Sequence, residues 1–253
     1  MAYADEYIVK TEKLTAIADS IREKTGETDT ITIDEMPNKM DEVFEKGKKS
    51  QYDEFWDAFQ QNGNRTYYNY GFGGHGWTDD TFKPKYNMKP VNANYMFASS
   101  QITNLVTALD KAGVELSFEN TTTMTYMFMY SEIQEVGTID TRKANTVDLL
   151  NGWTNCVTIG KIIFSDTVAQ NIGGAYECEK LENIRAVEGV IRKNINFSPC
   201  KVLSMQSVDN LTNALMTITD GVARTFSLHA DVKAKLTDEQ IATITTEKGW
   251  TLA

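Results

Sequence analysis

The sequence has 253 residues, 41% of them hydrophobic, so it is long enough for two modules or one extended array. Its net charge of -10 makes nucleic acid and anionic membranes poor partners, because each phosphate contact needs a lysine or an arginine. No apolar run reaches the roughly 18 residues of a membrane span, and Met1–Lys10 shows no signal-peptide pattern. We therefore expect a protein that is assembled inside a cell, without membrane insertion.

Residues 1–62 predict a small helical module. The first helix has an apolar stripe at helical spacing, formed by Leu14, Ile17, Ala18 and Ile21. We expect further short elements at residues 31–33 (extended), 40–44 (helix) and 52–60 (aromatic helix). Residues 1–60 carry 15 acidic and 8 basic side chains, more acidic than the rest of the chain. The stripe can seat the helix on its own module or on another subunit, and the sequence leaves both open.

Residues 64–95 are rich in aromatic side chains and in glycines, which break any long element. Tyrosine and tryptophan suit binding sites, because they combine a large apolar face with a polar end. We therefore identify a candidate ligand-binding platform of Tyr67, Tyr68, Tyr70 and Trp77. The alternative is that these side chains plug the open edge of the array that follows.

From residue 95 onward the sequence repeats itself. A large aromatic side chain recurs, at intervals that shorten along the chain, at Phe97, Phe128, Trp153, Tyr176 and Phe197. Aliphatic residues follow most of them at offsets of five and eight positions, as Ile102 and Leu105 follow Phe97. Apolar offsets on a drifting period predict a solenoid, with insertions in one set of loops.

The cysteines follow the same repeat, because Cys178 lies midway in the sequence between Cys156 and Cys200. Small side chains that stack on their own copies are typical of a repeat interior. A zinc site needs cysteine or histidine pairs roughly two to four residues apart, which the sequence lacks. Three cysteines also leave one over in any disulfide pairing. We expect buried thiols, and we assign these cysteines and the five recurring aromatic residues to the repeat interior as structural residues.

Residues 204–253 predict a terminal unit. Ser204 can cap a helix, residues 223–228 alternate as a short strand, and Thr237 with Gln240 forms a capping-box pattern. A terminal repeat must cover the open edge of a stack, so an atypical final unit is expected.

No catalytic arrangement is evident. The two histidines, His75 and His229, have no partner at metal-ligand spacing, and the glycine-rich run around His75 lacks the features of a phosphate loop. Asp79 and Asp80 beside Trp77 are the most tempting carboxylates, but neighbours on an extended chain point in opposite directions. We expect no enzyme, no catalytic residue, no metal and no cofactor.

Two stretches resemble known families. Residues 14–26 (LTAIADSIREKTG) followed by residues 31–37 (ITIDEMP) resemble an N-terminal module of tail and baseplate-associated proteins from phages of Gram-positive bacteria. Residues 55–253, with the ending KGWTL, are similar to irregular leucine-rich repeats of BspA type, which occur in bacterial surface adhesins and in the same phage proteins. The resemblance implies a virion or tail-like particle component that displays its repeats for adhesion. The chain departs from the leucine-rich consensus by using isoleucine, valine and methionine.

We expect an α+β chain, with a helical attachment module at residues 1–62, an irregular leucine-rich-repeat solenoid at residues 63–203 and a C-terminal helical capping unit at residues 204–253. The expected function is a non-enzymatic virion structural protein of a phage or tailocin, assembled in the host cytoplasm, in the tail, baseplate or fibre. Expected partners are other virion proteins through residues 1–62, a host-surface glycan or protein, and further copies of the chain. Two alternatives stay open: a bacterial cell-surface leucine-rich adhesin, and a glycan-processing enzyme of the particle.

Overall fold

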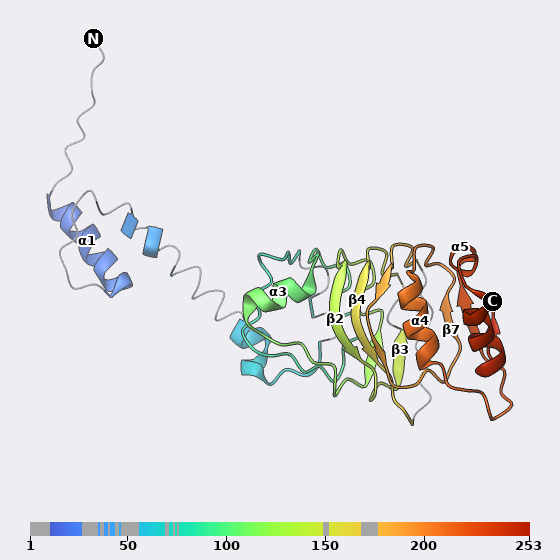
Figure 1. Ribbon diagram of the computed structural model, residues 1–253. Coiled ribbons are helices and arrows are strands. Elements are labelled where there is room, and N and C mark those ends of the chain that lie inside the picture. Colours follow the sequence, from blue (N-terminus) through green and yellow to red (C-terminus); the bar gives the residue numbers. More distant parts are fainter. Residues whose placement is uncertain are drawn as a thin grey trace, which may run out of the picture. The chain divides into compact units, whose positions relative to one another are not determined.

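A computed structural model describes residues 11–26, 35, 38–39, 41–43, 46, 56–68, 71–72, 74, 76–148, 152–167 and 177–253 (Figure 1). The chain divides into two compact units, Met1–Phe59 and Gln60–Ala253. The extended element predicted at residues 31–33 lies outside the described residues. Of the helix predicted at residues 40–44, residues 41–43 are described and are helical.

The first unit contains helix α1, Thr11–Thr25. One face of the helix is buried in a small apolar cluster that comprises Ala18, Ile21 and Val43. Ile17 lies on another face and is 42% exposed. Gly26 follows the helix with φ at +78°, the left-handed conformation that ends many helices. The predicted stripe is therefore divided between a face packed inside the unit and an exposed isoleucine.

The second unit combines short helices with short strands. Its helical elements are η1 (Gln61–Gly63), α3 (Leu105–Ala112), α4 (Met205–Ala214), α5 (Ala230–Lys233), α6 (Asp238–Ala242) and η2 (Thr243–Glu247). Its strands are β1 (Thr123–Thr125), β2 (Glu135–Asp140), β3 (Thr146–Asp148), β4 (Thr158–Ile163), β5 (Asn183–Ile184), β6 (Val187–Glu188), β7 (Ile195–Phe197), β8 (Thr225–Leu228) and β9 (Thr251–Leu252). Among the described residues no helix is long and apolar enough to cross a membrane.

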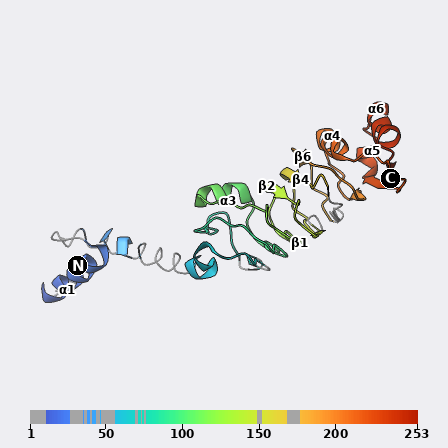
Figure 2. The ribbon, with the colours of Figure 1, turned by 90° about the horizontal axis from the view of Figure 1, so that it is seen from below.

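All strand pairs of the described residues are parallel. One sheet pairs β1 with β3, a second has the order β2-β4-β5 with β6 also on β4, and a third has the order β7-β8-β9. The register sets Glu135 opposite Thr158 and Ile195 opposite Phe226. Figure 2 shows helices α3 and α4 along one side of the second unit and strand β1 on the opposite side.

The prediction of a leucine-rich-repeat solenoid is wrong. The strands form three separate small parallel sheets, and none of them is closed or runs on through the described chain. Outside the three sheets, backbone pairing between segments consists of isolated β-bridges, such as Tyr67 with Asn92 and Ile191 with Leu215. The drifting spacing explains the error, because intervals that shorten from one aromatic residue to the next do not keep successive strands in one register. The fold is a mixture of helices with small parallel sheets.

Aromatic rings stack in the core of the second unit. Phe97 and Phe128 are 12° from parallel with centroids 5.7 Å apart, and the Trp153 ring lies 4.2 Å from Phe128. Phe72 continues the stack at 5.2 Å from Phe97. All four rings are fully buried. Stacked pairs of this kind contribute about 0.5–1.5 kcal/mol beyond the burial of their apolar area.

The aliphatic residues at the repeated offsets lie in the same core over most of the repeat region. The buried members are Ile102, Leu105, Ile133, Val136, Ile159, Ile162, Leu181 and Ile184. Phe197 is buried too, but Val202 at its offset of five is 43% exposed. Tyr176 lies outside the described residues. The apolar spacing therefore places core side chains correctly up to residue 197 and fails where α4 begins.

Two helices near the C-terminus begin with the N-cap residues that the sequence predicts. The Ser204 side chain accepts from the Ser207 amide at the start of α4, and Thr237 and Gln240 form both bonds of the capping box at α6. These two predictions are confirmed. Trp250 is buried behind the last helical turn, and its indole donates to the Met216 carbonyl at 2.7 Å.

Candidate functional site

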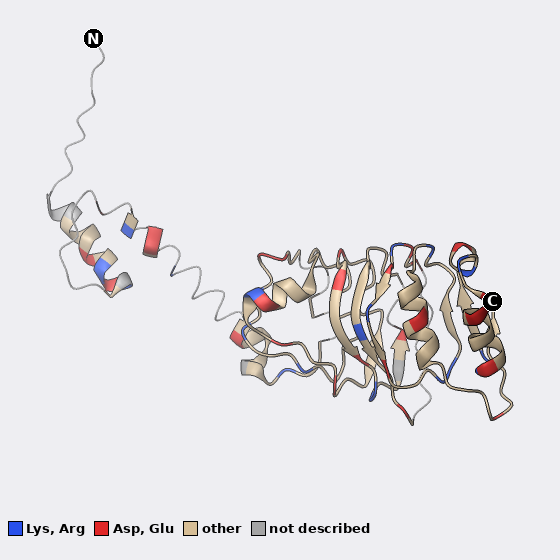
Figure 3. Cartoon of the chain, in the orientation of Figure 1, with Lys and Arg blue, Asp and Glu red and all other residues tan. Residues whose placement is uncertain are grey.

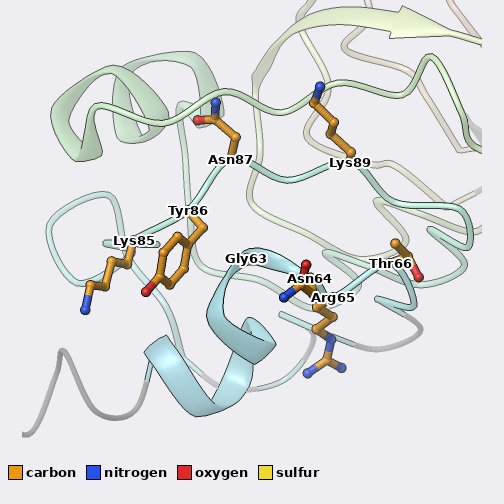
Figure 4. Close-up of a pocket in the computed structure, with 8 residues that line it drawn as sticks. All are labelled: Gly63, Asn64, Arg65, Thr66, Lys85, Tyr86, Asn87 and Lys89. Carbon is orange, nitrogen blue, oxygen red and sulfur yellow. The ribbon is translucent and has the colours of Figure 1, made fainter.

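A concave site lies near the start of the second unit. Its cavity has a volume of about 600 Å³, a size typical of small-ligand pockets. Figure 4 shows the lining residues, which come from two chain segments: Gly63, Asn64, Arg65, Thr66, Lys85, Tyr86, Asn87 and Lys89. We call this cavity the basic pocket, because the described residues of its lining include three cations and no carboxylate.

The buried side chain of Gln60 joins the two segments. Its amide oxygen accepts from the backbone amides of Lys85 and Tyr86 at 2.7 and 3.0 Å. Its Nε2 donates to the Tyr86 carbonyl at 2.8 Å. Gly63 also lies against this segment, since a Cβ there would be 3.2 Å from Tyr86 Cδ1 and the backbone has φ at +85°. The walls of the pocket are therefore fixed by hydrogen bonds and close packing.

We expect Gln60→Ala to lower the free energy of unfolding by about 2–4 kcal/mol, because the change leaves backbone groups of Lys85 and Tyr86 without partners. Each buried polar group that loses its bond costs about 1–3 kcal/mol. Chemical denaturation followed by tryptophan fluorescence measures the loss. Gln134→Ala changes an exposed glutamine and should stay within about 0.5 kcal/mol. Equal losses in the two variants would contradict the role assigned to Gln60.

Residues 82–90 alternate between core and solvent. The buried positions are Phe82, Pro84, Met88 and Pro90, and the exposed positions are Lys83, Lys85, Asn87 and Lys89. A period of two is that of an extended chain, in which alternate side chains point to opposite sides. The segment therefore carries its lysines on its outer side and uses its apolar residues to fasten itself to the core.

The positive charges lie around the rim of the basic pocket. In Figure 4 the side chains of Arg65, Lys85 and Lys89 extend in three different directions. The Lys85 ammonium lies 5.6 Å from the Tyr86 ring centroid, and Lys89 is 3.8 Å from a Glu119 carboxylate oxygen. An exposed ion pair of that length contributes little to stability, but the Glu119 carboxylate offsets part of the positive charge at Lys89.

The Arg65 side chain is held by backbone and ring contacts. Its Nε donates to the Tyr67 carbonyl at 2.9 Å, and its guanidinium carbon lies 5.3 Å from the Tyr68 ring centroid. These contacts orient the guanidinium group at the rim. The guanidinium therefore presents a planar, charged donor group at this corner of the pocket.

The residues of the predicted aromatic platform have different surroundings. Tyr67 is 66% exposed, whereas Tyr68 is 1% exposed, with its ring 5.6 Å from that of Phe72. Trp77 is half-buried, and Tyr70 lies outside the described residues. Within the described chain, Tyr67 is therefore the platform residue that offers most of its ring to solvent.

The two adjacent aspartates bind different partners. Asp79 accepts from the amides of Thr103 and Asn104 at 2.7 and 3.2 Å and from the Thr103 hydroxyl. Asp80 forms an exposed ion pair with Lys111 at 3.1 Å. Asp79 thus contacts the residues that precede helix α3, and Asp80 contacts a residue in the last turn of that helix. Asp79 is a structural hydrogen-bond acceptor at the start of α3.

The three cysteines form no disulfide bond and are buried. The Cys178 thiol contacts the Trp153 carbonyl, with Sγ to oxygen 3.3 Å. Burial raises the pKa of all three thiols, that of Cys178 to about 12. These are the properties of structural thiols and not of nucleophiles, because the thiolate is the reactive form.

The raised thiol pKa values predict a loss of stability at alkaline pH. A thiol of the unfolded chain ionises near pH 8.5, so the folded state holds the proton over a range in which the unfolded state releases it. The contribution is complete below about pH 8.5 and is lost as the pH rises toward the folded pKa. Denaturation at about pH 7 and pH 10, with iodoacetamide labelling of the native chain, checks this. Rapid labelling of any cysteine in the folded protein would contradict it.

Sequence reasoning does not identify the residues that build the basic pocket. Aromatic clusters, carboxylate pairs and metal-ligand spacing are the patterns it relies on, and none of these describes Gln60 with Lys85 and Lys89. One signal is present: residues 83–90 read KPKYNMKP, with lysines on one side of an alternating pattern and no acidic residue. The contact of Gln60 with the distant backbone of Lys85 has no counterpart in the sequence pattern.

The described residues contain no group of three or more histidine, cysteine, aspartate or glutamate side chains that could hold a metal ion. His229 accepts from the Asp231 amide at 3.1 Å, and His75 lies outside the described residues. The sequence matches no protein-family model and no curated protein, and the fold matches no solved structure.

Proposed function

We propose that the chain is a non-enzymatic structural component of a phage or tailocin particle, in its tail, baseplate or fibre, and that it attaches the particle to a host surface. The carrying observation is the division into two compact units. Helix α1, which overlaps the stretch that resembles a tail-associated module, belongs to the first unit, and the basic pocket belongs entirely to the second. A separate unit for anchoring and a separate unit for ligand binding fit an attachment protein.

In this proposal the first unit binds other particle proteins. The buried face of α1 is occupied by packing within its own unit, whereas Ile17 remains 42% exposed and available to a partner. Several copies of the chain on one particle raise the effective concentration of the second unit at the host surface, so weak single contacts suffice.

Immunoelectron microscopy tests the proposal. Antibodies raised against the full chain are applied to particles released by the producing cells, and we expect label at the tail or baseplate. Addition of the purified chain should also reduce adsorption of the particles to their host. Label on the producing cell's own surface, with none on particles, would instead favour a bacterial cell-surface adhesin and would overturn the particle role.

A further inference from the structure

A second cavity lies between helix α3 and strand β2. Its volume of about 280 Å³ is just below the roughly 300–1,000 Å³ of pockets for drug-sized ligands, so it suits a smaller molecule. The lining comes from α3, from residues 114–118 and from residues 136–138 of β2. All three segments lie within residues 76–145, which the structure describes without a gap. We call this cavity the α3 pocket.

The α3 pocket arises where a helix replaces a strand. Leu105 and Val136 hold equivalent positions in the sequence repeat, but β2 continues beyond Val136, whereas helix α3 begins at Leu105. Strand β2 is at the edge of its sheet, and on that side the described residues pair with it only through the bridge between Asn104 and Glu135. Paired strands lie about 4.8 Å apart, but a helix with its side chains is about 10–12 Å wide. The wider helix leaves a space along the edge of β2, and Gly137, which has no side chain, does not fill it.

The interior of the α3 pocket is apolar. Its buried lining residues include Leu105, Phe118 and Val136. Val106, Leu109 and Leu116 also line the pocket but are only half-buried, so each keeps apolar surface that a ligand can cover. Removal of such surface from water is the dominant favourable contribution to the binding of an apolar group.

The wall formed by residues 114–118 is held in place by the segment before it. The Glu115 amide donates to the Asn87 side-chain oxygen at 2.9 Å, and the Glu115 carbonyl accepts from the Met88 amide at 2.7 Å. The Ser117 amide donates to the Met88 carbonyl at 2.9 Å. A pocket whose walls are already ordered loses little conformational entropy when a ligand binds.

The charged groups of the α3 pocket are negative. Asp110 and Glu115 are exposed and line the pocket, and the described lining contains no lysine or arginine. In the described part of the chain neither carboxylate forms an ion pair or a hydrogen bond. Lys111, next to Asp110, pairs instead with Asp80 at 3.1 Å, and Figure 3 shows the charged residues of α3 together at one end of the helix. The pocket thus combines an apolar interior with two unpaired negative charges.

From this combination we infer that the α3 pocket binds a small organic cation, an ammonium group carried on a compact alkyl or aryl body. The apolar body occupies the space between α3 and β2, and the ammonium group lies against Asp110 and Glu115. The hydroxyl groups of Ser117 and Thr138 also line the pocket and can accept hydrogen bonds from the ammonium group. A neutral ligand of the same shape gains the burial without the charge attraction, and an anion is repelled. The inference goes beyond the proposed particle role and does not depend on it.

Three probes of nearly equal size separate the contribution of charge from that of burial: phenethylammonium, phenethyl alcohol and phenylacetate. Each is titrated into the isotope-labelled full chain, and binding is followed by the amide chemical shifts in nuclear magnetic resonance spectra. We expect the cation to bind at least about fivefold more tightly than the alcohol at low salt, with a preference that decreases as salt rises. The anion should bind most weakly, and the largest shifts should fall on residues 105–118 and 136–138. Equal affinities of the cation and the alcohol, no binding of the cation, or shifts confined to other residues overturns the inference.

Two pairs of charge variants test the role of the carboxylates. Asp110→Asn with Glu115→Gln should weaken binding of phenethylammonium by about fivefold and leave the affinity for the alcohol within about twofold, because only the charge attraction is lost. Glu239→Gln with Glu247→Gln removes the same charge from two exposed positions elsewhere in the second unit and should change either affinity by less than about twofold. All four side chains are exposed, so both variants should fold normally. Equal weakening by the two pairs, or no weakening by the first, overturns the charge assignment.

A filled pocket tests the location of the apolar body. Val106 lies against the edge of β2, since a Cβ at Gly137 would be 3.7 Å from Val106 Cγ2. Val106→Phe places a ring in a cavity of about 280 Å³ and should weaken binding of both the cation and the alcohol by at least about fivefold, because no room remains for a second ring. Val202→Phe makes the same change at a valine that is 43% exposed and should leave both affinities within about twofold. Thermal unfolding of both variants verifies that they are folded, and unchanged binding by folded Val106→Phe overturns the inference.

Discussion

Phe128→Ala should lower the free energy of unfolding of the second unit by about 3–5 kcal/mol. The Phe128 ring is fully buried and lies in the stack between Phe97 and Trp153, at 5.7 and 4.2 Å. Truncation removes its apolar area from the core and ends two ring contacts at once. The rings on either side are held by their own neighbours, so the cavity cannot close fully. Urea denaturation monitored by tryptophan fluorescence measures the change, since Trp153 contacts the missing ring.

Two further variants separate stacking from simple burial. Phe128→Leu retains most of the apolar volume and should lose about 1–2 kcal/mol, part of it from the lost ring pairs. Tyr67→Ala removes a ring that is 66% exposed and should stay within about 0.5 kcal/mol. A loss for Phe128→Ala no larger than that of Tyr67→Ala would show that the ring stack does not stabilise the core.

The sequence predicts the core better than it predicts the backbone. Apolar offsets identify Ile102, Ile133 and Ile159 as core residues, and each is fully buried. Burial of a side chain depends on which residues are apolar, and that pattern is visible in one chain. Continuity of a sheet depends on whether each backbone amide meets the next segment in register, and loop length decides that. This is why the residues of the stack are found from the pattern while the expected continuous sheet is wrong.

Some backbone conformations have no signal in the residue types. Tyr95 and Tyr126 both adopt positive φ, at +53°, and their rings stack with centroids 5.2 Å apart. Glycine or asparagine is the usual occupant of that region, so a bulky aromatic residue gives no warning of it. The tertiary contact between the two rings compensates for part of the local strain.

The basic pocket can be predicted from the sequence only in part. The alternation of its lysines in a stretch without acidic residues is visible in the sequence. Their position in a pocket is not, because it depends on hydrogen bonds from Gln60 that hold residues 85–86 beside the 61–64 turn. Asp79 shows the opposite case. The sequence offers it as a carboxylate for chemistry, and its bonds to Thr103 and Asn104 are visible only in three dimensions.

Gly189→Ala should be among the most destabilising single changes in the chain, with a loss of more than about 3 kcal/mol. Gly189 has φ at +79°, a conformation in which an alanine costs about 1–2 kcal/mol by itself. A Cβ at this position would also overlap with the carbonyl oxygen of Phe164, which is backbone and cannot move aside as a flexible side chain can. The Phe164 amide donates to the Glu188 carbonyl at 2.8 Å, so relief of the clash would disturb the pairing of β4 with β6.

Gly221→Ala is the matched control, because it isolates the backbone term from the clash. Gly221 has φ at +70° and no atom within 4 Å of an added Cβ, so the variant should lose only about 1–2 kcal/mol. Urea denaturation of both variants gives the comparison, and recovery of Gly189→Ala only as insoluble protein, with Gly221→Ala soluble, would agree with the larger loss. Indistinguishable losses in the two variants would mean that residue 189 yields to a side chain, and the close approach of Gly189 to Phe164 would then not be what holds β6 against β4.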